Sequence, residues 1–321
     1  MDLLLFSFAP QMVWLQLVLL VVGIAIVLWG ADKLTDGAVG LAERMGISQL
    51  VIGLTIVAMG TSMPEFCVSL ISALKGTPDL AVGNVVGSNI FNALLIVGCA
   101  ALVAPITILH VTVKKDIPFA LVASVVLLIM CMDGNIGRLD AAILAVFFIL
   151  FMYFTLKGAK GEASPDEEKT PMSPLKASAL VLVGLVCLIL GSSVFVDNAS
   201  ALAHTLGVSD AVIGLTIVAG GTSLPELATS VVAARRGNSG IAIGNVLGSN
   251  VFNILFILGL TGLISPMTIQ GITSLDLSMM VVSMIMLWLF SFTKYTIQRW
   301  EGAVLAAVFL GYVSYLVYNA V

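Results

Sequence analysis

The stretches that decide the fold are GLTIVAMGTSMPEF (residues 53–66) and its second copy, GLTIVAGGTSLPEL (residues 214–227). Both copies continue into another shared block, GNVVGSNIFN at residues 83–92 and GNVLGSNVFN at residues 244–253. Residues 53–98 align with residues 214–259 without a gap at an offset of 161, and 26 of the 46 positions are identical. The chain therefore contains an internal duplication, and we expect its two copies to form similar structures.

The composition places this duplication in a lipid bilayer. Of the 321 residues, 60% are hydrophobic and 10% are charged, against about 25% charged in an ordinary soluble protein. So few charged side chains cannot cover the surface of a soluble globule of this size. The net charge of −4 and the lack of a basic tract exclude nucleic-acid binding. Nothing in the composition indicates a cofactor or a protein partner.

Ten apolar runs come close to the length of about 20 residues that crosses a membrane as a helix. They are residues 12–31, 47–74, 79–103, 117–132, 139–156, 177–195, 208–234, 240–264, 273–291 and 301–318. We expect no cleaved signal peptide, because Met1 to Gln11 contains no basic residue. The Pro, Ser and charged residues between Lys157 and Lys176 predict a solvated linker. The expected units are a first repeat at 1–158 (motif 53–98), a linker at 159–175 and a second repeat at 176–321 (motif 214–259).

Basic residues predict the orientation of the spans, because they gather on the cytoplasmic side. With ten spans, Lys75 and Arg138 lie on the side of the N-terminus, and the other twelve Lys and Arg lie on the opposite side. Both termini are therefore expected outside and the linker in the cytoplasm. Because each half contains an odd number of spans, the two halves must cross the membrane in opposite directions. This predicts an inverted repeat, the architecture of secondary transporters that alternate access around a midplane site.

Two acidic residues, Glu65 and Glu226, lie deep in apolar runs at equivalent positions of the two copies. A charge at the centre of a bilayer costs at least about 2.5–3.5 kcal/mol, so such residues usually serve a function. The proline before each glutamate predicts a broken helix. We expect the carbonyls at 58–60 and 219–221 to lose their helical donors and a bound cation to satisfy them. The structural alternatives are a packing kink and a protonated, hydrogen-bonded acid.

A second group of polar side chains supplies further oxygen ligands. Asn84, Ser88 and Asn92 recur every four residues on one face of a helix, and Asn245, Ser249 and Asn253 repeat the pattern. No His or Cys occurs among these candidates. An all-oxygen set suits Ca²⁺, which takes about 6–8 oxygens, and also Na⁺, but not zinc or copper. The alternative for such stripes is interhelical hydrogen bonding alone.

The paired GTSxPE and GNVxGSNxFN segments resemble the alpha repeats of the calcium/cation antiporter superfamily, most closely those of prokaryotic sodium/calcium exchangers. The resemblance implies an all-α fold of ten transmembrane helices in two inverted five-helix repeats, with four ion sites near the midplane. It further implies antiport of Na⁺ for Ca²⁺ by alternating access in the inner (plasma) membrane of a prokaryote. The bound ions would be transported rather than held as cofactors.

The resemblance also implies roles for individual residues. Glu65 and Glu226 would be shared by Ca²⁺ and Na⁺, with help for Ca²⁺ from the backbone oxygens of Thr61 and Thr222. Two outer Na⁺ sites would use Ala58, Thr61 and Ser88 in one half, and Ala219, Thr222 and Ser249 in the other. Asn92 and Asn253 would line the middle site, and the surrounding polar wall would consist of Ser62, Ser223, Asn84 and Asn245. Some relatives have Asp at the place of Asn92 or Asn253, so the two asparagines leave the ion stoichiometry open and argue against K⁺ dependence.

Three other functions compete with this interpretation. A Ca²⁺/H⁺ antiporter of the same fold would protonate Glu65 and Glu226 alternately, without needing the hydroxyl and amide oxygens. An ion channel would be expected to form a ring of ligands around a pore. An intramembrane enzyme is disfavoured, because His110 and His204 lie near span ends without metal-ligand spacing. For an exchanger, we expect the spans near 1–31 and 177–195 to slide across the rest as a gating pair.

Overall fold

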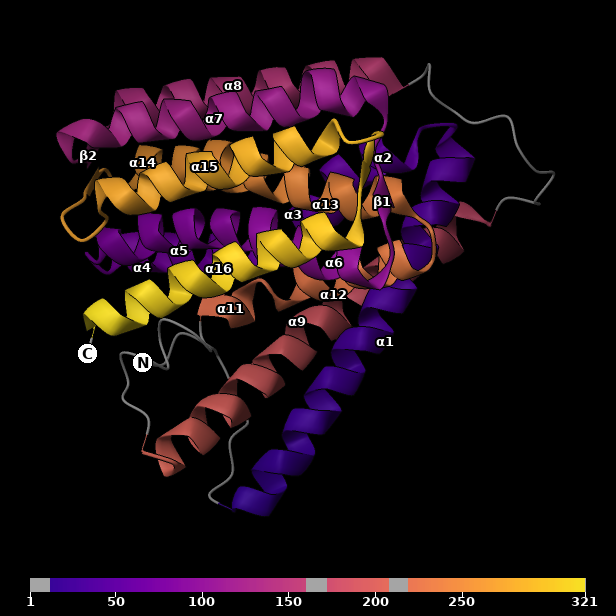
Figure 1. Cartoon of the computed structure of the whole chain (residues 1–321), viewed down its shortest axis with the longest axis horizontal. Coiled ribbons are helices and arrows are strands. Elements are labelled where there is room, and N and C mark those ends of the chain that lie inside the picture. Colours follow the sequence, from indigo (N-terminus) through magenta and orange to yellow (C-terminus); the bar gives the residue numbers. More distant parts are fainter. Residues whose placement is uncertain (1–11, 160–171, 208–218, 321) are drawn as a thin grey trace.

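The computed structural model describes residues 12–159, 172–207 and 219–320, which form a bundle of long helices with two short β-ladders (Figure 1). The first repeat comprises α1 (Val13–Met45), α2 (Gln49–Ile52), the π-helical turn η1 (Gly53–Val57), α3 (Ala58–Thr61), α4 (Met63–Leu74), α5 (Pro78–Ile90), the π-helical turn η2 (Phe91–Ile96), α6 (Val97–Val103), β1 (Ile106–Thr107), the π-helical turn η3 (Thr112–Asp116), α7 (Ile117–Met130), the 3₁₀ turn η4 (Cys131–Asp133), β2 (Asn135–Ile136) and α8 (Arg138–Gly158). The second comprises α9 (Pro174–Thr205), α11 (Ala219–Thr222), α12 (Leu224–Arg235), α13 (Ser239–Val251), the π-helical turn η7 (Phe252–Ile257), α14 (Leu258–Ile264), β3 (Met267–Thr268), α15 (Ser274–Ser291), β4 (Thr296–Ile297) and α16 (Arg299–Ala320).

The structural repeat extends beyond the region of high sequence identity. The bounds of α4, α5, η2 and α6 return 161 residues later as those of α12, α13, η7 and α14. The same offset separates the first residue of α1 from that of α9, and the first residue of α8 from that of α16. The duplication inferred from residues 53–98 therefore covers the whole of each repeat.

The two β-ladders show how the repeats are related. β1 pairs antiparallel with β4, and β2 pairs antiparallel with β3, so each ladder takes one strand from each repeat. The amide of Ile108 donates to the carbonyl of Tyr295 at 2.8 Å, and the same bond recurs 161 residues on, from Ile269 to Gly134, at 2.7 Å. β1 and β2 lie at opposite ends of the bundle (Figure 1). The operation that superimposes one repeat on the other therefore also interchanges the two ends of the bundle, as the predicted inverted repeat requires.

The membrane spans agree with the expected order. Among the described residues, eight helical segments are long and apolar enough to cross a membrane, and the bent pair Gln49–Thr61 and Met63–Leu74 provides a ninth. The one remaining expected run, 208–234, lies partly outside the described residues, as does most of the expected linker at 159–175. The chain is a multi-pass membrane protein whose described spans are all helical. Which end of the bundle faces the cytoplasm stays a prediction.

Two helices continue past the ends expected from hydropathy. The expected limits at residues 31 and 195 are wrong for the helices, because α1 continues to Met45 and α9 to Thr205. Charged residues such as Asp32 and Lys33 end the first apolar run but do not end the helix, because Leu34 and Ala38 remain fully buried against other helices. Packing rather than hydropathy therefore sets the length of α1.

α1 and α9 cross each other at unusually close range. A β-carbon on Gly184 would lie 2.6 Å from the amide nitrogen of Leu34 and 2.8 Å from the carbonyl oxygen of Gly30. The repeat-related contact joins Gly23 and Gly191. A β-carbon on Gly191 would lie 3.0 Å from the carbonyl oxygen of Gly23. Glycines at such a crossing allow two backbones to touch. α1 and α9 thus form one unit, here called the gating pair, which lies obliquely against the other helices, the core (Figure 1).

The centre of the core is formed by α13 and its repeat mate α5. Every residue of α13 from Ile241 to Val251 is buried. On α5, the buried residues include Ser88 and Asn89. The buried polar side chains on these two helices consequently face other protein groups rather than lipid.

Candidate cation-binding site

Each repeat places its glutamate in the first turn of a helix that begins directly after a break. α3 and α4 meet at Ser62 with a bend of 47°, and α11 and α12 meet at Ser223. Pro64 and Pro225 lie in the first turn of α4 and α12, where the missing amide hydrogen of proline is tolerated best. The helix break expected at each proline is confirmed.

The two breaks contact each other through reciprocal hydrogen bonds. The hydroxyl of Ser62 donates to Oε1 of Glu226 at 2.8 Å, and the hydroxyl of Ser223 donates to Oε1 of Glu65 at 2.9 Å. Each serine therefore serves the carboxylate of the other repeat. The bonds bring both glutamates to one place and make the site a joint product of the two repeats.

Among the residues that the structure describes, the second oxygen of each carboxylate has no hydrogen-bond partner. Oε2 of Glu65 and Oε2 of Glu226 are buried without a hydrogen bond, and the two residues are 0% and 1% exposed. In the described part of the chain, the ion pairs around Lys33 and Arg236 involve Asp32 and Asp36, and neither glutamate has a basic partner. Two buried acids without a cationic side chain must bind protons or a cation.

Asn84 and Asn245 fasten the helix pairs that carry the glutamates. The amide nitrogen of Asn84 donates to the carbonyl of Glu65 at 3.1 Å and to the hydroxyl of Ser69 at 3.0 Å. The equivalent bonds of Asn245 measure 3.2 and 3.0 Å, and its side-chain oxygen accepts a bond of 3.0 Å from the hydroxyl of Thr61. These asparagines of the polar wall therefore act as interhelical hydrogen-bonding residues.

Asn92 and Asn253 belong to a cluster of four buried asparagines at the interface between the repeats. The amide nitrogen of Asn92 donates to Oδ1 of Asn250 at 3.0 Å, and that of Asn253 donates to Oδ1 of Asn89 at 3.1 Å. Oδ1 of Asn92 and Oδ1 of Asn253 are buried without a hydrogen-bond partner. The two side chains thus each offer one unused carbonyl oxygen, the type of atom that binds Na⁺ or Ca²⁺.

The hydroxyls expected in the site are close to the carboxylates. The hydroxyl oxygens of Ser88 and Ser223 lie 3.2 Å apart. Because Ser223 donates its single proton to Glu65, it accepts the hydrogen bond from Ser88. Ser249 lies beside Glu226, and its buried oxygen has no hydrogen-bond partner. Thr222 lies beside Glu65. The structure therefore gathers Ser88, Ser249 and Thr222 around the two acids, and their roles as cation ligands stay predictions.

The expectation for the backbone carbonyls needs correction. The carbonyl of Ala58 keeps its helical donor, because the amide of Ser62 donates to it at 3.0 Å. The missing amide of Pro64 would be missed at the carbonyl four residues back, that of Gly60. That carbonyl accepts another backbone amide at the end of α3. Ala219 begins α11, but the surroundings of its side chain lie outside the described part of the chain.

Sequence reasoning missed Asn89 and Asn250. Both are fully buried, and their side chains join α5 to α13 by reciprocal hydrogen bonds to backbone carbonyls at 3.2 and 3.4 Å. The signal was present, because the GSN triplet occurs in both copies. A search for residues four apart on one helix face passes over it.

The assembled chemistry is oxygen only. Within the described ranges, no group of three or more His, Cys, Asp and Glu side chains could hold a metal ion. His110 packs against Tyr295 next to the β1–β4 ladder, and His204 lies in the last turn of α9. Two carboxylates supplemented by neutral oxygens suit a transported hard cation.

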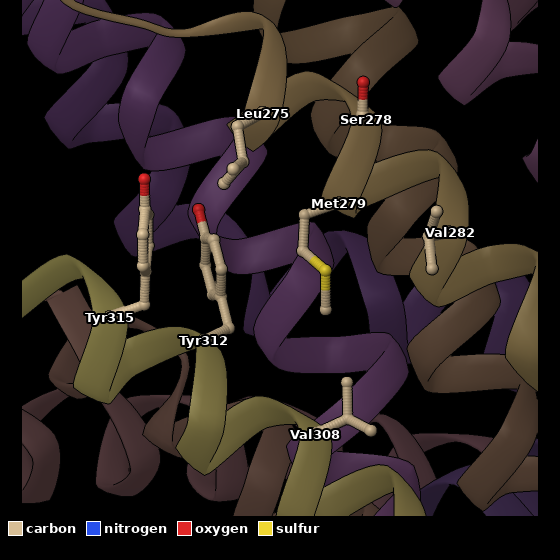
Figure 2. A pocket seen from close by; sticks show the side chains of 7 residues that line it. All are labelled: Leu275, Ser278, Met279, Val282, Val308, Tyr312 and Tyr315. Atoms are coloured by element: carbon tan, nitrogen blue, oxygen red, sulfur yellow. The ribbon is translucent and has the colours of Figure 1, made fainter.

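An apolar groove between α15 and α16 is separate from this site. Figure 2 shows the side chains that line it, which are Leu275, Ser278, Met279, Val282, Val308, Tyr312 and Tyr315. It has no charged side chain, and the hydroxyl of Tyr312 donates outside the lining set, to Asp276 at 2.7 Å. The groove lacks the ligands that a cation requires.

The chain is similar to known proteins across both repeats. The family described as sodium/calcium exchanger protein matches residues 15–157 and 176–318. The inner membrane protein YrbG of Escherichia coli (strain K12) is 40% identical over 82% of this chain and 85% of its own length. The sodium/calcium exchanger MaX1 of Methanosarcina acetivorans is 31% identical over 96% of this chain and all of its own. A structure of the sodium-calcium exchanger NCX_Mj, soaked with 10 mM Na⁺ and 10 mM Sr²⁺, gives a TM-score of 0.83 at 31% identity, covering 94% of this chain and 99% of that one.

Proposed function

This chain belongs to the sodium/calcium exchanger family and is a membrane cation exchanger rather than an enzyme, and from this premise we propose that it exchanges Na⁺ for Ca²⁺ at the site between Glu65 and Glu226. One Ca²⁺ or two Na⁺ ions would neutralise two ionised carboxylates. Because both ions would need the same carboxylates, one would have to leave before the other binds. If a third Na⁺ were bound, each exchange cycle would carry one net charge across the membrane, and the exchange would be coupled to the membrane voltage.

The observation that carries the proposal is the pair of unpartnered carboxylate oxygens, Oε2 of Glu65 and Oε2 of Glu226. A buried carboxylate with one oxygen that accepts no hydrogen bond is poorly compensated. A cation placed between the two acids would compensate both. This supports a shared site rather than two independent ones.

The neutral oxygens favour Na⁺ over H⁺ as the counter-ion. Oδ1 of Asn92, Oδ1 of Asn253 and Oγ of Ser249 are also buried without a partner. A proton on Glu226 would let that carboxyl donate to Ser249 beside it, but it would leave the two asparagine oxygens unsatisfied. A Na⁺ ion coordinates several oxygens at once and would use them. The Ca²⁺/H⁺ antiporter is therefore the second candidate.

Alternating access is supported by the unequal contacts that the gating pair makes with the two halves of the core. Arg236, at the end of α12, forms ion pairs with Asp32 and Asp36 of α1. The helix of the first repeat that corresponds to α12 is α4. Its Cys67 is exposed, whereas the equivalent residue of α12, Ala228, is 6% exposed. We propose that transport exchanges these two arrangements by sliding α1 and α9 together, with the Ca²⁺-loaded and the Na⁺-loaded site both permitting the movement.

The test is Ca²⁺ uptake into proteoliposomes at clamped pH, with Na⁺, K⁺ or choline inside and a nominally Na⁺-free buffer outside. We expect ⁴⁵Ca²⁺ to accumulate only in Na⁺-loaded vesicles, and the uptake to saturate with external Ca²⁺. Accumulation that needs an imposed pH gradient and ignores Na⁺ would overturn Na⁺ coupling in favour of H⁺. Flux that needs no counter-ion would identify a channel.

A further inference from the structure

We propose that Asn89 and Asn250 are positioning residues that fix the side-chain amides of Asn92 and Asn253 with their oxygens, and not their NH₂ groups, toward the transported cations. The inference rests on the proposed function in that cations bind between Glu65 and Glu226. It adds two residues to the site and a physical reason for its ligand orientation.

The argument starts from two backbone carbonyls. The side-chain nitrogen of Asn89 donates to the carbonyl oxygen of Asn250 at 3.2 Å, and that of Asn250 donates to the carbonyl oxygen of Asn89 at 3.4 Å. A backbone carbonyl can only accept. The NH₂ group of each asparagine must therefore face the partner carbonyl, and its Oδ1 must face the other way.

The orientation then passes to the next pair of asparagines. Oδ1 of Asn89 can only accept, so Asn253 must direct its NH₂ group to it, at 3.1 Å. In the same way, Oδ1 of Asn250 receives the NH₂ group of Asn92 at 3.0 Å. Side-chain amide orientation is normally assigned from the hydrogen-bond network. Here the network begins at two backbone carbonyls, which can only accept, so the orientation of each side-chain amide is determined.

The result is a fixed direction for the two unused oxygens. Oδ1 of Asn92 and Oδ1 of Asn253 lie opposite the bonded NH₂ groups and are buried without partners. A reversed amide would aim two N–H dipoles at a cation and would set oxygen against oxygen at Asn89 or Asn250. Both orienting residues are 0% exposed, so water does not compete for these bonds.

The substitution Asn89→Leu removes the acceptor that orients Asn253, and Asn253→Asp removes the need for orientation, because a carboxylate presents oxygen on both sides. The probes are NaCl and CaCl₂, titrated separately at constant ionic strength into the purified protein in detergent. The readout is the cation concentration that gives half of the rise in melting temperature. For Na⁺, Ca²⁺ or both, we expect Asn89→Leu to raise this midpoint about tenfold. A change of this size corresponds to the free energy that one buried hydrogen bond contributes.

The decisive result is the dependence on background. In an Asn253→Asp background, we expect Asn89→Leu to leave the midpoints unchanged or to lower them, because it removes an oxygen that faces the new carboxylate. Asn92→Asp should not rescue Asn89→Leu. As the matched control, Asn250→Leu should be rescued by Asn92→Asp and not by Asn253→Asp. A residue that merely packs would give the same loss in every background.

Equal losses in all backgrounds, or no loss with Asn89→Leu alone, would overturn the inference. Asn89→Ala is measured alongside in case leucine prevents folding, which the melting temperature without added cation reports. The two proposals can fail separately. If Na⁺ does not drive Ca²⁺ uptake but the Ca²⁺ midpoints follow the predicted pattern of rescue, Na⁺ exchange is wrong and the orientation of the amides stands.

Discussion

Each half of the candidate site is completed by a residue from the other repeat. Ser62 donates to Glu226 and Ser223 donates to Glu65, so each carboxylate has one oxygen held by a hydroxyl and one oxygen without a partner. The hydroxyl fixes the plane of the carboxylate and thereby the direction in which the unpartnered oxygen points. Neither repeat could form this arrangement alone.

Ser62→Ala and Ser223→Ala should therefore weaken cation binding to similar extents. Each substitution removes one hydrogen bond to an acid and allows the carboxylate to rotate, which corresponds to about three- to tenfold weaker binding. Half-saturating Ca²⁺ concentrations for uptake would measure the effect. Ser72→Ala is the control, because Ser72 lies buried on α4 with a hydroxyl that has no hydrogen-bond partner. A loss at one serine with none at the other would contradict the reciprocal arrangement.

The positions of the acids and hydroxyls were predictable from the sequence, but their partners were not. Glu65, Glu226 and the Ser and Asn residues beside them follow from the duplication and from helical spacing. The bonds between the repeats join residues more than 150 positions apart, and their geometry depends on how α4, α5, α12 and α13 dock. Asn89 was missed because its role exists only in contact with Asn250.

At the scale of elements, two local features shape the molecule, namely the broken helices and the glycine crossing of the gating pair. Proline predicted the breaks, because its effect on a helix is local. The length of α1 and the π-helical turns that carry Asn92 and Asn253 were not predicted. A π-helical turn changes the backbone hydrogen-bond register without changing hydropathy, and such turns are frequent at functional sites.

Substitution of Gly184 tests the crossing of α1 and α9. A β-carbon there would lie 2.6 Å from the backbone of Leu34, so Gly184→Ala should force the helices apart and cost about 1–3 kcal/mol of stability. Thermal unfolding in detergent would record this as a lower melting temperature. Gly311→Ala is the matched control, because a β-carbon at Gly311 of α16 meets nothing within 4 Å, and alanine favours a helix over glycine by up to about 1 kcal/mol. Equal tolerance of both changes would argue against the close crossing.

At the scale of the whole molecule, the inverted repeat and the uneven contacts of the gating pair belong together. The two repeats share their fold, yet α12 is tied to α1 by Arg236 while the equivalent face of α4 leaves Cys67 exposed. Because the two repeats have equivalent structures, the contacts that α12 now makes with the gating pair could be made by α4 instead, with little difference in free energy. This supports transport by movement of α1 and α9 against the core.

Cross-linking the gating pair to the core should stop exchange. In a chain whose four cysteines are replaced, Asp36→Cys and Arg236→Cys would place thiols on α1 and at the end of α12, where the native side chains pair. A short bifunctional thiol reagent should abolish Na⁺-dependent Ca²⁺ uptake, and cleavage of the linker should restore it. The control joins two core positions, Ala73→Cys and Ser265→Cys, whose native residues are hydrogen-bonded at 3.3 Å. Undiminished exchange across the linked α1 and α12 would contradict the sliding movement.

The central claim is that one acid from each repeat forms a single shared cation site, and it is tested most directly by ⁴⁵Ca²⁺ uptake in Na⁺-loaded proteoliposomes. Glu65→Gln and Glu226→Gln are compared with the unchanged protein and with Glu43→Gln, an exposed glutamate on α1. The account predicts that either substitution in the pair abolishes uptake, because one remaining carboxylate cannot neutralise Ca²⁺, while Glu43→Gln leaves uptake unchanged. Uptake at the unchanged level in Glu65→Gln or in Glu226→Gln would contradict the shared site.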